Sequence, residues 1–226
     1  MPATAKRQRR PGPGRLSAED AAGLQDRLLD AAFELFTKRG YGDASMEQIA
    51  KDAGASTKTL YSRFANKGEI LEAVVRRNIE RTVTRHVRSF VLQPTEAEPR
   101  EFLIKFGMQV VLASLEAETL GMQRVTFAES VRWPGLRRMY REVNGGAVNV
   151  IERAMLLWRA QGKLHFTEDA NRLASLCYAM MTHEQRIGSI LGDPMTQADA
   201  RRYVELAVDV FLKGIGPAPK TAAKKK

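Results

Sequence analysis

Residues 45–64 read SMEQIAKDAGASTKTLYSRF and contain two short amphipathic segments on either side of a glycine. Ala50 lies where two helices that meet near a right angle need a small side chain, and Gly54 lies where the turn needs a positive φ. Apolar side chains at Leu60 and Phe64 can anchor the second segment to a core. The stretch therefore predicts a helix, a tight turn and a second helix.

The second of these helices, expected over residues 56–64, carries a polar and basic face without a carboxylate. That face consists of Thr57, Lys58, Tyr61, Ser62 and Arg63. A helix that enters the major groove of DNA has this composition, because it needs donors for base edges and no acid to repel phosphate. An ordinary helical hairpin can also carry an alanine and a glycine at these positions, so both readings stay open on this stretch alone.

Outside this stretch, apolar residues recur at helical spacing from Ser17 to about Ile215, which predicts an all-α fold. Capping patterns at Ser17 with Asp20, at Ser45 with Gln48 and at Asn66 with Glu69 mark helix starts. Besides the two short helices, we expect helices over residues 17–39, 66–90, 100–117, 119–132, 135–161, 168–191 and 196–213. Gly145-Gly146 predicts a kinked or weakened turn, or a close contact with another helix.

The 226 residues contain 44% hydrophobic and 27% charged residues, which are values of a globular protein. The formal charge is +10, from 36 basic and 26 acidic residues. Nine of the basic residues lie in two tails, 1–15 and 214–226, which leaves 27 basic residues against 26 acidic ones in the body. Such tails suit nucleic acid or an anionic membrane surface, and solvated tails that aid solubility explain them equally well.

Several observations favour a cytoplasmic protein that has no membrane partner. Cys177 is the single cysteine and cannot form an internal disulfide. No apolar run approaches the roughly 18 residues that a transmembrane helix needs, and no apolar signal core follows the basic start. Between an oxidant sensor and inert packing, the apolar neighbours of Cys177 favour inert packing.

No pattern in the sequence favours an enzyme. His183-Glu184 begins like a zinc-protease motif, but position 187 is isoleucine instead of the second histidine. No glycine-rich phosphate loop, GxSxG elbow or cysteine cluster is present. We therefore expect no catalytic residue, no metal and no cofactor, and we expect His183 to be a polar residue of a core or a pocket.

The wider run 28–75 reads LLDAAFELFTKRGYGDASMEQIAKDAGASTKTLYSRFANKGEILEAVV. It resembles the N-terminal domain of the TetR family of transcriptional regulators, through the Ala-Ala-x-x-Leu-Phe stripe, Gly40-Tyr41, Ile-Ala-x-x-Ala-Gly, Thr59-Leu60-Tyr61 and Phe64 followed by Lys67. The resemblance implies a helix-turn-helix DNA-binding domain followed by a helical domain for ligand binding and dimerisation. Together with the apolar-poor composition of the two tails, it predicts four parts: a disordered basic arm at 1–16, the two domains at 17–66 and 67–215, and a disordered basic tail at 216–226.

By this resemblance the chain is expected to be a homodimeric regulator that binds double-stranded operator DNA. It is further expected to be a repressor that a small apolar or aromatic effector releases from the operator. The expected DNA-contacting residues are Ser45, Thr57, Lys58, Thr59, Tyr61, Ser62, Arg63 and Lys67. Ser62 and Arg63 depart from the aromatic residue and the histidine frequent in the family, so the operator sequence stays open.

The family also implies an effector pocket and a subunit interface in the second domain. The candidates for the pocket are large side chains that could equally be core, together with one histidine: Phe102, Phe106, Met122, Phe127, Trp133, Tyr140, Trp158 and His183. The candidates for the interface lie on the last two helices, where burial within one subunit competes for them: Leu176, Met180, Ile187, Tyr203, Leu206 and Val210.

Two other functions remain compatible with the sequence. An architectural protein could bind DNA without sequence preference through the basic arms. A helical carrier of small molecules could have lost DNA binding, although the polar face of residues 56–64 disfavours that alternative.

Overall fold

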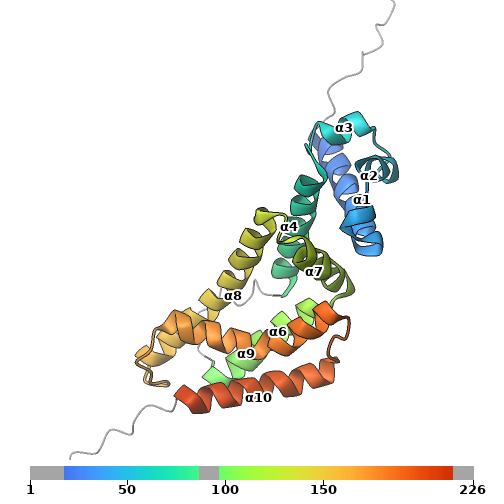
Figure 1. The fold of residues 1–226 in the computed structure, drawn as a ribbon. Helices are drawn as coiled ribbons and strands as arrows, with labels where there is room; N and C mark the ends of the chain where they lie inside the picture. The colour runs from blue at the N-terminus through green and yellow to red at the C-terminus, as the bar shows by residue number, and fades with distance from the viewer. Residues whose placement is uncertain (1–17, 87–96, 216–226) are drawn as a thin grey trace, which may run out of the picture.

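The computed structural model describes residues 18–86 and 97–215 (Figure 1), and within them the chain is helical with no strand. The all-α prediction is therefore confirmed. The helices are α1 (Ala18–Asp43), α2 (Met46–Asp52), α3 (Thr57–Tyr61), α4 (Lys67–His86), α6 (Pro99–Leu115), α7 (Ala117–Glu129), α8 (Pro134–Ala160), α9 (Ala170–Leu191) and α10 (Gln197–Ile215). Among the described helices, none has both the length and the apolar character that crossing a bilayer requires.

Side-chain caps fix the starts of α2 and α4. Ser45 Oγ accepts the backbone N–H of Gln48 at 3.1 Å, and Asn66 Oδ1 accepts that of Glu69 at 3.0 Å. Each bond satisfies a donor that has no partner within the helix. The capping patterns at Ser45 and Asn66 are confirmed, whereas Ser17 lies outside the described residues.

Three helix predictions need correction. α1 does not end before Gly40: the glycine has φ 81° and ψ 165°, which kinks the chain, and a further turn follows. The second short helix is limited to α3, because Ser62 and Arg63 form a turn and Phe64 follows in irregular backbone. α8 continues through Gly145-Gly146, and a Cβ on either glycine would meet no atom within 4 Å, so the predicted kinked or weakened turn is not seen and the predicted close contact is wrong.

The described helices enclose two hydrophobic cores. The first is formed by α1 to α4 together with Met122 and Val125 of α7 and Leu136 and Met139 of α8. The second lies between α6, the C-terminal half of α8, α9 and α10. Figure 1 shows α1, α2 and α3 at one end of the molecule and α10 at the other, with α4, α7 and α8 between them. Part of α7 and α8 is thus integral to the N-terminal core.

The junction between α4 and the α7–α8 turn is packed without room for another methyl group. A Cβ on Gly68 of α4 would overlap the ring of Trp133, and a Cβ on Gly135 of α8 would overlap the carboxylate of Glu72. Trp133 also packs edge-on against Tyr41 of α1, with 6.3 Å between ring centroids. Gly68 is therefore required by the close approach of the Trp133 ring, whereas at Gly135 the flexible Glu72 side chain could move aside.

The other end of α4 is fixed to the start of α7. Glu116 accepts hydrogen bonds from Arg85 Nη1 and His86 Nε2, each at 2.8 Å. Burial alone would raise the pKa of Glu116, but the bonds from His86 and Arg85 outweigh it and lower the pKa. The start of α4 is therefore held against the turn between α7 and α8, and its end is held against the start of α7.

We expect Gly68→Ala to lower the free energy of unfolding by about 1–3 kcal/mol, because the added methyl group must displace the Trp133 ring. Gly145→Ala is the matched control, since its methyl group would meet no atom within 4 Å and alanine favours a helix by up to about 1 kcal/mol. Urea unfolding followed by circular dichroism measures both. Equal stability of the two variants would contradict close packing at the junction.

Candidate functional site

The turn between α2 and α3 has the geometry that the sequence predicts. Gly54 has φ 65°, and its N–H donates to the carbonyl of Lys51 at 3.1 Å. Ala50 is buried, and its carbonyl accepts the N–H of Ala55 at 2.8 Å. Leu60 is fully buried in the first core, so one face of α3 is fixed and the opposite face is left to solvent.

The exposed face of α3 carries donors and no acid. Lys58 and Ser62 are exposed, Tyr61 is 48% exposed despite its large ring, and Thr57 is half-buried. Thr57, Lys58 and Tyr61 have no side-chain partner among the described residues, so their polar groups can reach an external ligand. An exposed, uncompensated positive charge beside hydroxyl donors can bind a phosphate backbone and base edges.

Other predicted contact residues already bind within the protein. Ser56 Oγ caps α3 and lies 2.7 Å from Thr59 Oγ1, and Ser62 Oγ donates to the carbonyl of Thr59 at 2.7 Å. Arg63 Nη1 donates to Gln25 Oε1 of α1 at 3.3 Å. These residues shape α3 and its attachment, and Thr57, Lys58 and Tyr61 form the available part of the face.

Lys67 has a structural role that the sequence did not predict. Its ammonium group donates to the carbonyls of Tyr41, of Gly42 at 3.1 Å and of Ala44 at 2.8 Å, and lies 4.3 Å from the ring centroid of Tyr41. All three donors are used on the loop that joins α1 to α2. The structure therefore gives Lys67 an internal contact that ties this loop to α4, and its expected phosphate contact stays a prediction.

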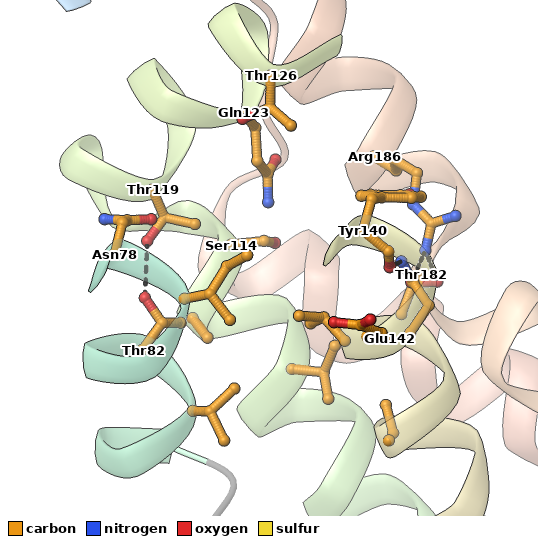
Figure 2. A pocket seen from close by; sticks show the side chains of 18 of the residues that line it. Asn78, Thr82, Ser114, Thr119, Gln123, Thr126, Tyr140, Glu142, Thr182 and Arg186 are labelled. Atoms are coloured by element: carbon orange, nitrogen blue, oxygen red, sulfur yellow. Dashed lines mark hydrogen bonds between the residues drawn. The ribbon is translucent and has the colours of Figure 1, made fainter. Parts of the chain in front are cut away.

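A second site is a cavity of about 560 Å³ between α4, α6, α7, α8 and α9, shown in Figure 2. Cavities of this size hold small organic molecules. Three of the predicted effector-binding residues, Met122, Phe127 and Tyr140, line it. Apolar side chains from α4, α6 and α8 form much of the remaining wall, among them Ile79, Val110 and Val150.

The other predicted pocket residues lie elsewhere. Phe102 stacks on Phe106 at 6.1 Å and packs edge-on against Trp158 at 5.5 Å, so these three rings belong to the second core. Trp133 lies at the junction of α4 with the α7–α8 turn. His183 is exposed on α9, and its expected place in a core or pocket is wrong.

The polar lining of the cavity was missed by sequence reasoning. Gln123 of α7 points into the cavity, and Arg186 of α9 lies in the opposite wall beside Tyr140 and Thr182 (Figure 2). Gln123 and Arg186 each belong to a helix that the sequence predicts from apolar residues at helical spacing. A polar side chain in such a helix is more often exposed to solvent than directed into a cavity. The one available signal was the pair Thr182 and Arg186, four residues apart on a largely apolar helix.

Burial shifts two titratable groups on α9. Burial raises the pKa of Tyr178, and nearby Tyr140 adds to this shift, while the guanidinium of Arg186 opposes it. Burial also raises the pKa of Cys177 to about 12, so its thiol stays protonated. Because the thiolate is the reactive form, the prediction of an inert packing role for Cys177 is supported.

The predicted interface residues form an exposed apolar stripe on α9 and α10. Leu176 and Ile187 of α9 are 53% and 41% exposed, and Leu206 and Val210 of α10 are 63% and 51% exposed. Met180 and Tyr203 are half-buried. Leu191 extends the stripe along α9 with 76% exposure. Large apolar groups gathered on one surface typically mark a contact with another molecule.

Two family profiles match this chain. The profile described as "Bacterial regulatory proteins, tetR family" matches residues 28–74, which include the helix-turn-helix. The profile described as "AefR-like transcriptional repressor, C-terminal domain" matches residues 101–214, just over half of the chain. The chain belongs to the TetR family. The resemblance seen in the sequence is thereby confirmed.

Individual TetR-family proteins resemble this chain to different extents. SrpR of Pseudomonas putida, an HTH-type transcriptional regulator, is 39% identical over 61 residues, which cover 27% of this chain and only 29% of SrpR. YvkB of Bacillus subtilis is 23% identical over 192 residues, covering 84% of this chain and 95% of YvkB. A TetR-family structure from Mesorhizobium loti superposes with a TM-score of 0.73 at 21% identity, covering 87% of this chain and 98% of that one. At this identity the superposition shows a shared fold.

We expect Lys67→Met to lower the free energy of unfolding by about 1–3 kcal/mol, because three carbonyl groups lose a charged donor. Lys58→Met is the matched control: Lys58 is exposed without a partner among the described residues, so the change should stay within about 0.5 kcal/mol. Chemical unfolding of the free protein measures both. Unchanged stability of Lys67→Met would show that the internal contacts contribute nothing.

Proposed function

We propose that this TetR-family protein is a homodimeric transcriptional repressor that binds operator DNA and is released by a small-molecule effector. The observation that carries the proposal is the exposed, acid-free face of α3, held by a helix-turn-helix with the required glycine and caps. The match of residues 101–214 to the C-terminal domain of AefR-like repressors supports repression over activation.

In this proposal the face of α3 enters the major groove. Thr57, Lys58 and Tyr61 contact bases or phosphates, since their polar groups have no partner among the described residues. Ser45, Thr59, Ser62 and Arg63 lie beside this face, and their internal bonds fix the orientation of α3 and its approach to the backbone. These four residues therefore contribute to DNA affinity both by positioning α3 and by contacting the DNA directly.

The subunits associate through the apolar stripe on α9 and α10. DNA half-sites face each other across a two-fold axis, so two copies of α3 must be held at a fixed separation. The core of one subunit does not bury four large apolar side chains of this stripe: Leu176, Ile187, Leu206 and Val210. A four-helix bundle across the axis would bury them.

Effector response follows from the place of the cavity. Its walls include α4 and α7, which also pack against α1 and carry part of the first core. A ligand that prefers one arrangement of α4 and α7 therefore also shifts the position of α3. Coupling of this kind typically amounts to about 1–3 kcal/mol.

Sequence-specific DNA binding is tested by selecting duplexes from a random pool with the full-length protein. We expect enrichment of a two-fold symmetric sequence, and we expect Lys58→Ala to weaken binding to it at least tenfold by loss of a charged contact in each subunit. Lys105→Ala, a change of the same exposed charge on α6, is the control and should leave affinity unchanged. Fluorescence anisotropy at several salt concentrations measures both variants.

The same titrations address the architectural alternative, in which the tails bind DNA without sequence preference. Deletion of residues 1–15 removes five basic groups and should flatten the salt dependence while discrimination between the selected and a scrambled duplex survives. If no sequence is enriched, or discrimination is lost with the arm and not with changes on α3, the architectural function replaces the proposed one.

We expect Leu206→Glu to yield monomers, because each copy would bury a carboxylate in the apolar interface. Val131→Glu is the control: Val131 is 78% exposed in the turn between α7 and α8, away from the stripe. Multi-angle light scattering gives the mass of each variant. A dimer that survives Leu206→Glu would place the interface on another surface.

A further inference from the structure

Arg186 lies in the wall of the cavity without a carboxylate partner. Its Nη2 donates to Asn144 Oδ1 and to Thr182 Oγ1, each at 3.2 Å, and both acceptors are neutral. Its guanidinium carbon lies 5.7 Å from the ring centroid of Tyr140 and 5.8 Å from that of Tyr178. No carboxylate among the described residues comes within 4.0 Å of it.

The charges around the cavity leave it positive. Besides half-buried Arg186, the described lining holds Arg153 and Glu142, both of α8 and both exposed. These three side chains give the lining one net positive charge, and Arg186 is the one of the three that is half-buried and has no carboxylate of the described residues within 4.0 Å. Charges withdrawn from water are normally paired, and a cation held by neutral groups and aromatic rings therefore has room for an anionic partner.

Gln123 supplies a second polar anchor away from Arg186. Its side chain points into the cavity (Figure 2), and its Oε1 is buried with no hydrogen-bond partner. The neighbouring hydroxyl of Thr126 already donates to the carbonyl of Met122 at 2.7 Å. A buried amide without a partner is costly, and a ligand hydroxyl can satisfy it in either orientation of the amide, because a hydroxyl both donates and accepts.

The surface between these anchors is mostly apolar. Val110 of α6, Phe127 of α7 and Val150 of α8 contribute to it, and Tyr140 packs edge-on against Phe127 at 5.1 Å between ring centroids. Apolar walls with two separated polar anchors favour a molecule with an apolar body and a polar group at each end. A cationic ligand is disfavoured by the guanidinium.

We propose that the effector is a hydroxylated aromatic acid, whose carboxylate binds Arg186, whose ring system fills the apolar middle of the cavity and whose hydroxyl group binds Gln123. This inference rests on the proposed function, in which the cavity is the effector site. It adds the chemical class of the ligand and assigns Arg186 and Gln123 as the residues that determine specificity.

The test uses three probes on the full-length protein: 4′-hydroxybiphenyl-4-carboxylate, its methyl ester and biphenyl-4-carboxylate. Isothermal titration calorimetry should show that the hydroxy acid binds at least tenfold more tightly than the ester, because a charge-assisted hydrogen bond contributes about tenfold to a hundredfold in affinity. The hydroxy acid should also bind more tightly than the acid without a hydroxyl group.

Variants assign the two anchors. Arg186→Gln should weaken binding of the hydroxy acid about tenfold to a hundredfold and leave the ester unchanged, whereas Arg186→Lys should keep the preference for the acid. Arg138→Gln is the matched control, because Arg138 is an exposed arginine of α8 outside the cavity lining, and this change should alter affinity by less than about threefold. Gln123→Leu should abolish the advantage of the hydroxy acid over biphenyl-4-carboxylate.

An ester that binds as tightly as the acid, an Arg186→Gln variant with unchanged affinity, or no binding of either acid at millimolar concentration would overturn the proposal. Circular dichroism shows whether each variant is folded. If Arg186→Gln does not fold, Arg186→Lys still tests the proposal, because it keeps the positive charge and should keep the preference for the acid. Duplex selection without any probe distinguishes the two proposals. A protein that selects an operator and rejects both acids loses only the ligand class, and one that binds acid and selects no duplex loses the regulatory function.

Discussion

The close approach of α4 to the turn between α7 and α8 is the packing constraint on which the rest of the structure depends. Gly68 lies against the ring of Trp133, and this contact leaves no gap in which α4 could move independently of the turn. At its start α4 holds the loop between α1 and α2 through Lys67, and at its end it is bound to Glu116. A single helix therefore connects the helix-turn-helix to the wall of the cavity.

Two different kinds of interior serve the two ends of this helix. Around α3 the core is apolar and closely packed, because the exposed face can be presented accurately only if the buried face is fixed. Between α4 and α9 the interior is open, and Gln123 and Arg186 have hydrogen-bonding capacity that the protein itself leaves unused. Such a region is less stable than a filled core, and this is the usual property of a ligand site.

The sequence was sufficient for features that depend on neighbouring residues along the chain. Ser45, Asn66 and Gly54 act within three or four residues of themselves, so their caps and turn could be predicted without knowledge of the fold. The exposed stripe at Leu206 and Val210 was also predictable, since helical periodicity sets which residues share a face. The end of α1 could not be predicted from the sequence, because a glycine at positive φ can kink a helix as well as end it.

The sequence by itself determined the all-α class, the helix-turn-helix and the polar face of α3, because local backbone geometry and periodicity specify them. Only the tertiary structure decided that Lys67 binds carbonyls across the loop, that Phe102 and Trp158 fill a core, and that Arg186 lies in a cavity. A side chain of a given type is equally compatible with solvent, core or pocket until distant helices meet around it. The physical reason is that long-range packing decides burial and hydrogen-bond partners, whereas spacing along one helix decides only which side of it a residue occupies.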